Sequence, residues 1–287
     1  MGILTNSETA PIPDDYIATY DGFSKLWISS SALACVMTCG LKFKYKYIDK
    51  LSGAINIRMT AGSGAHKGRQ HDLEQKIESH EDLSPDECTD AARDYVTNAF
   101  DGNEVHVEKE FEGKSKDAAK GITVDFAVDM ASKDREVFLP EIQPAKVEEP
   151  MAVDYPGISR TIVGKTDVID TDDVIRDLKT GKRSYGQAKA DDNMGLTTYG
   201  LLYYALNQEL PSGYAIENVV ASGKSPVKTN VYESERGVDR LQRQLDRFAY
   251  WCRVIDSGIF GPADPCSWFC SESWCQFWAQ CPCRSHQ

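Results

Sequence analysis

The chain has 287 residues, of which 41% are apolar, and a formal net charge of −12, so it is long enough to bury a sizeable core. It contains no apolar run of about 18 residues and does not begin with a basic, then apolar, leader, so we expect no export and no membrane span and place the protein in a cytoplasm. The negative charge excludes a broadly basic surface for nucleic acid, but not a local basic track.

The N-terminal part is predicted to start with an irregular lead-in, residues 1–22, that contains two prolines. Residues 29–48 follow, and their Ser-rich start is typical of a capped helix. Lys42, Lys44 and Lys46 then alternate with aromatic residues. This period of two leaves helix and strand both open there, and the interleaved basic and aromatic side chains suit phosphates and bases.

A capping box marks the next helix, because Ser84 can serve as N-cap with Pro85 and Glu87 in the first turn. Strand candidates then follow at residues 104–112, 121–130, 160–170 and 173–181. Between them, residues 140–156 contain four prolines and several acids, which indicates a loop or an insertion.

The C-terminal part is predicted to contain two helices and a cysteine-rich tail. Residues 191–208 have a helical pattern in spite of two glycines, and apolar residues recur at steps of three and four from Val238 to Ile255. The order of helices, strands, helix, strand, helix and tail predicts one α/β domain with a mixed central sheet.

Asp177 and Lys179 lie two residues apart in a predicted strand and therefore share one face. Asp167 lies near the end of the preceding strand, just before a short turn, so it can point at the same spot if the two strands are neighbours. A D-x-K triplet occurs by chance roughly once in a chain of this length, and a cross-strand ion pair is its ordinary explanation. With a second carboxylate and a carbonyl, however, it can hold Mg²⁺ or Mn²⁺ and hydrolyse a phosphodiester.

The stretch GKTDVID…DVIRDLKTGKRS resembles the core of the PD-(D/E)XK nucleases. Its form is close to the RecB-type branch, which includes bacterial recombination nucleases, phage exonucleases and CRISPR-associated iron–sulfur exonucleases. Three further stretches resemble that branch in its order, namely ISSSALACVMTCGLKFKYKYI, GSGAHKGRQHDLE and WFCSESWCQFWAQC. Together they extend from Ser29 to Cys281.

The resemblance implies a restriction-endonuclease-like α/β fold over residues 23–287, with a mixed central sheet flanked by helices. An N-terminal helical region and the C-terminal cysteine-rich tail would pack together. The implied site residues are the metal ligands Asp167 and Asp177, the carbonyl of Leu178, the extra metal ligand His66, the catalytic Lys179 and a second catalytic residue, the helix residue Tyr199. For His66 the alternative is an ordinary surface histidine, and no role is expected for His71, His80 or His106.

Nine cysteines without a secretory signal argue against a disulfide framework. Cys270, Cys275 and Cys281 lie close together among aromatic residues, and grouped thiolates can hold a [4Fe–4S] cluster or a structural zinc. The resemblance implies iron–sulfur with Cys39 as fourth ligand, which would tie the two ends of the domain together. Zinc, or free thiols, are the alternatives, and the competing ligands are Cys35, Cys266 and Cys283.

Three functions are compatible with these patterns. The first is a metal-dependent DNA exonuclease of recombination, repair or processing, acting on single strands or duplex ends, in the host cytoplasm if the protein comes from a phage. The second is a weak or inactive nucleic-acid-binding or adaptor module of a recombination or CRISPR-adaptation complex, because Gly195 stands where the family usually has Gln, four residues before Tyr199. The third is a purely structural metalloprotein. The oligomeric state stays open.

Overall fold

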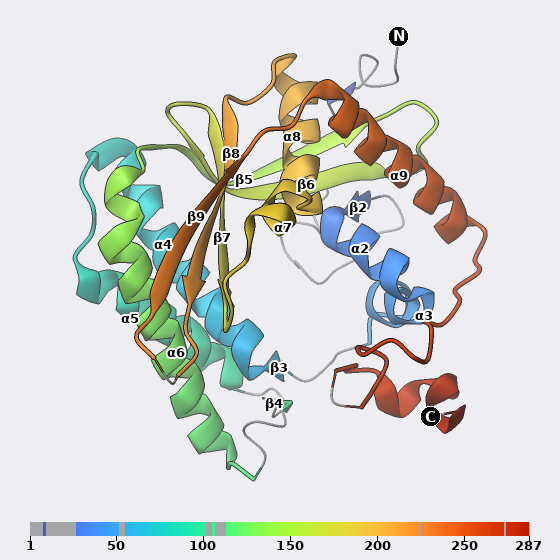
Figure 1. Ribbon diagram of the computed structural model, residues 1–287, viewed down its shortest axis with the longest axis horizontal. Coiled ribbons are helices and arrows are strands. Elements are labelled where there is room, and N and C mark those ends of the chain that lie inside the picture. The colour runs from blue at the N-terminus through green and yellow to red at the C-terminus, as the bar shows by residue number, and fades with distance from the viewer. Residues whose placement is uncertain are drawn as a thin grey trace.

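A mixed β-sheet forms the centre of the protein in a computed structural model that describes residues 8–9, 27–51, 55–101, 105–106, 113–223, 225–272 and 274–286 (Figure 1). Within these residues the sheet has seven strands in the order β1-β5-β6-β7-β8-β9, and β2 lies beside β6. Strand β7 is parallel to β8 and antiparallel to β6. The strands are β1 Glu8–Thr9, β2 Trp27–Ser29, β5 Pro144–Asp154, β6 Thr161–Asp170, β7 Val174–Gly181, β8 Gly213–Val220 and β9 Lys228–Ser234.

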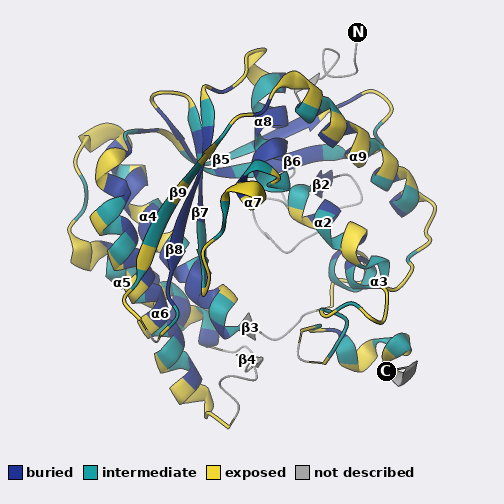
Figure 2. Ribbon diagram, viewed as in Figure 1, coloured by how far each residue is buried: buried dark blue, intermediate teal, exposed yellow. Residues whose placement is uncertain are grey.

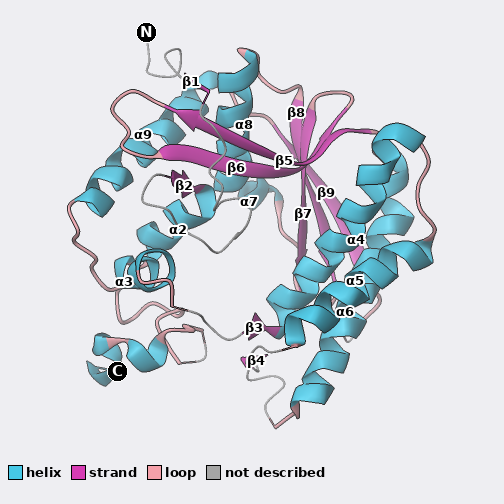
Figure 3. Ribbon diagram, turned by 180° about the vertical axis from the view of Figure 1, so that it is seen from behind, coloured by secondary structure: helices cyan, strands magenta, loops and turns pink. Residues whose placement is uncertain are grey.

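Helices pack on both faces of this sheet (Figure 3). One group packs on β6, β7 and β8 and consists of α4 Ile57–Ser79, α5 Pro85–Phe100 and α6 Lys116–Val137. The other group consists of α2 Ser30–Thr38, α7 Gln187–Asp191, α8 Met194–Asn207 and α9 Val238–Asp256. Figure 2 shows that β6 and β8 are largely buried, whereas β9 at the edge of the sheet is half-buried or exposed. The expected mixed sheet flanked by helices is confirmed.

Strands β6 and β7 separate soon after they meet. Their register holds two residue pairs, Val168 with Arg176 and Ile169 with Ile175. At its N-terminal end, from Thr161 to Val163, β6 pairs with β2 instead of β7. Figure 1 shows β5 and β6 fanning away from β7, β8 and β9. We call the opening between residues 164–167 of β6 and residues 177–179 of β7 the strand fork.

Two predicted elements are wrong. Residues 121–130 are not a strand but part of α6, which Ser115 caps by accepting a hydrogen bond from the N–H of Ala118 at 3.2 Å. The run VDFAVDM alternates like a strand, but Phe126 and Met130 also lie four residues apart, and this helical face packs on the core shared with α4 and α5. Tertiary packing therefore decides between the two periods.

Residues 140–156 are not a loop, because they contain β5, the antiparallel neighbour of β6. Pro144 begins this strand, a position where its missing N–H costs little. On its other edge, β5 pairs with β1 only at Val153 and Asp154 among the described residues, and Pro150 lies outside that short stretch. A proline there leaves the ladder with β6 intact.

The remaining expectations have mixed outcomes. The lysine and aromatic segment is helical, as α3 Gly40–Phe43 and a π-helical turn at Lys44–Ile48. The predicted strand at 104–112 lies mostly outside the described residues, which include only β4 Val105–His106, paired with β3 Ile55–Asn56. The lead-in likewise lies outside them, apart from β1. The helices expected at 84–100, 191–208 and 238–255 are confirmed as α5, α8 and α9.

The tail after α9 crosses the N-terminal helical region, as expected. The N–H of Leu41 donates to the carbonyl of Gly261 at 3.1 Å. A Cβ at Gly40 would lie 2.8 Å from that same oxygen, so only glycine permits this approach of the two backbones. Farther along, the rings of Tyr45 and Phe277 meet edge to face at 5.8 Å. No helix in the described part of the chain is long and apolar enough to span a membrane.

Candidate active site

The strand fork brings the predicted carboxylates and the lysine together. Asp177 is buried in β7, and one of its oxygens, Oδ2, forms an ion pair with Nζ of Lys179 two residues further on. The carboxylate of Asp167 enters the fork from β6, and its Oδ2 accepts the N–H of Leu178 at 2.9 Å. A side chain thus takes the place of the backbone partner at the point where the ladder opens.

His66 approaches Asp167 from α4, with 3.3 Å between its Nδ1 and Oδ2 of the carboxylate. A glycine makes this approach feasible, because a Cβ at Gly62 would lie 2.5 Å from Oγ1 of Thr180 in β7. Gly62 precedes His66 by one helical turn, so the same face of α4 packs on the strand and reaches the fork. The stretch GSGAHKGRQHDLE therefore lies in a helix, α4, that is directed at the fork.

The charges in the fork affect one another. Burial raises the pKa of Asp177 above its ordinary value, and the nearby charge of Asp167 adds to this while Lys179 opposes it. Burial would lower the pKa of Lys179, but the carboxylates of Asp177 and Asp167 outweigh it and raise that pKa. Lys179 therefore stays an ammonium group across the physiological range.

The donor set at the fork fits a hard divalent cation. Asp167 and Asp177 supply carboxylate oxygens, which Mg²⁺ and Mn²⁺ prefer. Within the described residues, the buried Oδ2 of Asp177 accepts no hydrogen bond of acceptable geometry. The group beside this oxygen is the ammonium of Lys179, with which it forms an ion pair. No set of three His, Cys, Asp or Glu side chains in that part of the chain is arranged to hold an ion, so water or substrate oxygens would complete the coordination.

Two of the predicted residues have a less direct place. Leu178 is buried, and the contact that ties it to the site is its N–H to Asp167, so its carbonyl as a metal ligand stays a prediction. The ring of Tyr199 on α8 lies against Gly164 of β6, where a Cβ would be 3.2 Å from it. Gly164 borders the fork, which places Tyr199 beside the site. Its catalytic role also stays a prediction.

Sequence reasoning missed a buried charge network behind the fork. It joins Arg69 on α4, Asp134 on α6, Glu217 on β8, Arg176 on β7 and Asp170 on β6. Charged residues are rarely buried unless they are paired. The Glu within the apolar run YAIENVV was the one signal of it in the sequence.

Asp134 gives this network a pH dependence. Burial raises the pKa of Asp134 to about 7. The positive charge of Arg69 opposes this shift, and the negative charges of Glu217 and Asp167 add to it. The folded protein then binds a proton that the unfolded chain releases between about pH 4 and 7, so the free energy of unfolding falls as pH rises through that window. We expect Asp134→Asn to abolish this pH-dependent decrease in the free energy of unfolding, which is on the order of a few kcal/mol. Urea denaturation at pH 5 and pH 8 measures it, and parallel pH dependences of wild type and variant would contradict it.

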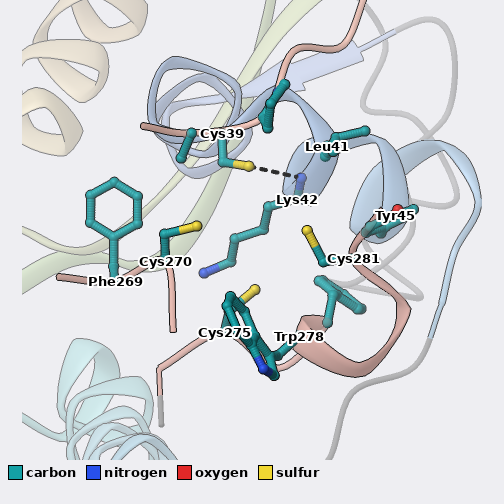
Figure 4. A pocket seen from close by; sticks show the side chains of 12 residues that line it. Cys39, Leu41, Lys42, Tyr45, Phe269, Cys270, Cys275, Trp278 and Cys281 are labelled. Atoms are coloured by element: carbon teal, nitrogen blue, oxygen red, sulfur yellow. Dashed lines mark hydrogen bonds between the residues drawn. The ribbon is translucent and has the colours of Figure 1, made fainter. Parts of the chain in front are cut away.

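The four predicted cluster cysteines line one small pocket between α3 and the tail, together with Lys42 and several aromatic side chains (Figure 4). The pocket residues come from both ends of the domain, namely Cys39, Cys270, Cys275 and Cys281. The sulfur of Cys39 also accepts the N–H of Lys42 at 3.4 Å. Soft sulfur donors suit an iron–sulfur cluster or zinc by their chemistry. In the described residues, however, no three of these cysteines are arranged to hold an ion, so the metal at this pocket stays a prediction.

The competing cysteines lie around this pocket and do not line it. Cys266 is exposed in the tail. Cys35 is on α2, one helical turn before Cys39, and Cys283 follows Cys281 in the last turn. Figure 4 shows the side chain of Lys42 extending among the sulfurs.

Comparisons with known proteins identify the family and the fold. A family model described as the PD-(D/E)XK nuclease superfamily matches residues 28–282. The crystal structure of a protein from Eubacterium rectale described as a "putative exonuclease" is similar, with a TM-score of 0.55, 11% identity and coverage of 92% of each chain, which shows a shared fold. No curated protein matches the sequence. The family match covers most of the chain, and the chain therefore belongs to the PD-(D/E)XK nuclease superfamily.

Proposed function

We propose that the protein is a metal-dependent DNA exonuclease acting on single strands or duplex ends. The observation that carries this proposal is the meeting of Asp167, Asp177, Lys179 and His66 at the strand fork. A chain that had kept only the fold would have no chemical reason to hold a lysine beside two carboxylates. The similar protein described as a "putative exonuclease" supports the choice of an exonuclease.

The residues at the fork have separate tasks in this proposal. Asp167, Asp177 and the carbonyl of Leu178 would hold Mg²⁺ or Mn²⁺. His66 would join them as a further ligand only when a cation is bound, because the described residues contain no three such side chains already arranged around an ion. A bound cation of this kind polarises a phosphodiester and lowers the pKa of a bound water. The Lys179 ammonium, held in place by Asp177, stabilises the negative charge that develops on the phosphate oxygens.

We further propose that Cys39, Cys270, Cys275 and Cys281 hold a [4Fe–4S] cluster that cross-links the ends of one nuclease domain, residues 23–287. The shared pocket and the resemblance of the tail support this, with zinc as the alternative occupant. The cluster serves structure in this proposal and carries no electrons. We place the protein in a cytoplasm, with DNA as its partner and recombination or CRISPR-adaptation proteins as further candidates.

End-labelled single-stranded and duplex DNA, incubated with Mn²⁺, Mg²⁺ or EDTA, test the function. We expect progressive shortening from an end with either metal and none with EDTA. A circular single strand of the same sequence should stay intact. Cleavage of the circle would show an endonuclease instead, and faster cleavage of the matching RNA would reassign the substrate.

Gly195 separates an active enzyme from a binding module. A Cβ there would lie 3.1 Å from Oδ1 of Asn193 and 4.0 Å from Oγ of Ser30, so no backbone blocks a larger side chain. We expect wild type to cut DNA and Gly195→Gln to cut equally fast or up to about tenfold faster, because an amide at this position would improve positioning.

Gly121→Gln is the matched control, since Gly121 also lies in a helix and a Cβ there would meet nothing within 4 Å. It should gain the same helix stability, up to about 1 kcal/mol, without a change in rate. An inert wild type with metal bound, from which Gly195→Gln recovers cleavage, would identify a binding module that has lost its nuclease activity.

A further inference from the structure

Glu217 lies in the middle of the buried charge network and is held by two arginines. It is only 2% exposed. Its Oε1 accepts Nη1 of Arg176 at 2.9 Å, and its Oε2 contacts Nη2 of Arg69. Each carboxylate oxygen therefore has its own guanidinium, and the two guanidiniums come from different elements of the fold.

These arginines lead directly to the elements that form the strand fork. Arg69 follows His66 by three residues on α4, so both lie on the side of the helix that faces the sheet. Arg176 immediately precedes Asp177 on β7. Nε of Arg176 also donates to Oδ2 of Asp170 at 2.6 Å, and Asp170 ends β6 three residues after Asp167. Helix α4 and strands β6 and β7 are thus connected through one carboxylate of β8.

Backbone pairing between β6 and β7 is limited to the two pairs described above. Beyond those pairs, side-chain contacts set how the two strands and α4 lie, among them the packing of Gly62 on Thr180 and the buried charge network. Buried ion clusters contribute little net stability, because the cost of removing charges from water offsets their attraction. Their best-supported use is to select one geometry among several. A cluster at the base of an open fork is placed to do this.

We propose that Glu217 is a positioning residue of the nuclease site, which rests on the function proposed above. It fixes α4 and β7 so that His66, Asp167 and Asp177 address one cation. Glu217 does not itself touch the substrate. It pairs in register with Leu178, on the face of the sheet covered by α4 and α6, whereas Asp177 pairs with Ile216, which packs toward α8.

Glu217→Gln tests the proposal because it keeps the shape of the side chain and removes its charge. We expect the variant to fold, as judged by circular dichroism, and to bind Mn²⁺ at least tenfold more weakly by titration followed with electron paramagnetic resonance. We expect kcat on DNA to fall at least tenfold and KM to stay within twofold, since the buried Glu217 cannot contact DNA. A merely structural residue would change stability and leave the affinity for Mn²⁺ as it was.

Asp72→Asn provides the matched control. Asp72 is fully buried on the same helix and accepts the N–H of Leu83 at 3.0 Å, and its Oδ2 lies 3.1 Å from Nε of Arg135. Its loss should destabilise the fold about as much, with the affinity for Mn²⁺ unchanged. Equal weakening of Mn²⁺ binding in both variants, or unchanged binding in Glu217→Gln, would overturn the proposal.

Arg176→Gln keeps the test open if Glu217→Gln does not fold. Arg176 is 21% exposed, so the change is milder, and we expect a roughly threefold loss of Mn²⁺ affinity. Unchanged affinity in this variant would also overturn the proposal. Should wild type bind Mn²⁺ but leave DNA intact, the proposed function fails, and the affinity comparison still decides whether Glu217 positions the cation site.

Discussion

Asp177→Ala and Lys179→Ala are each expected to slow DNA hydrolysis at least about a hundredfold, on the order of 3 kcal/mol of activation free energy. The first removes a cation ligand and the second removes the group that stabilises charge on the phosphate. Both variants should fold. The side chain of Lys179 is 37% exposed, so its ammonium can be hydrated once Asp177 is gone. Single-turnover cleavage with saturating Mn²⁺ measures the effect.

Lys146→Ala is the control for the loss of one positive charge. Lys146 is exposed on β5, where its Nζ lies 3.3 Å from Oε1 of Glu149. The substitution should leave the cleavage rate within twofold of that of wild type. Activity that survives both Asp177→Ala and Lys179→Ala would show that the fork is not the catalytic site. A similar loss in Lys146→Ala would indicate a general effect of charge on DNA binding.

Anaerobically purified protein is expected to be brown, with broad absorption near roughly 400 nm, where cysteine-bound iron–sulfur clusters absorb and zinc does not. Substitution of Cys39, Cys270, Cys275 or Cys281 by Ser should each remove the colour. The same changes should lower solubility and stability, because the proposed cluster would close a loop of roughly two hundred residues. Absorption spectra with iron, sulfide and zinc analysis are the measurements.

Cys266→Ser is the matched control, since Cys266 lies in the same tail but is exposed and does not line the pocket. Its colour should be unchanged. Colourless protein with one zinc per chain would select the alternative metal. Retained colour in Cys39→Ser would point to Cys35 or to another tail cysteine as the fourth ligand.

Local patterns were enough to predict the two strands that carry the carboxylates and the lysine. Asp177 and Lys179 were expected on one strand face, with Asp167 near them if the two strands were neighbours, and β6 and β7 are neighbours. The capping box at Ser84 and the apolar stripe of α9 were likewise sufficient. In each case residues close in sequence determine the geometry.

Patterns failed where distant parts of the chain decide. The period of VDFAVDM fits both a strand and a helix, and only its packing against α4 and α5 makes it a helix. Pro144 and Pro150 argued against a strand because the sequence does not show which edge of β5 is paired. Glu217 on β8 contacts Arg69 on α4 and Arg176 on β7, and Arg69 is more than a hundred residues away in the sequence. No short-range periodicity encodes such contacts.

The hydrogen bond from the Leu178 N–H to Asp167 bears on how such a protein can change during evolution. In the proposed function Asp167 would hold the cation, and it also closes the ladder where two strands part, so selection for the fold and selection for activity would act on the same carboxylate. Asp177 and Lys179 instead form an ion pair with each other. A lineage that abandons cleavage but keeps the fold should therefore lose Lys179 or Asp177 first, and should retain an acceptor such as Asp or Asn at position 167 longest.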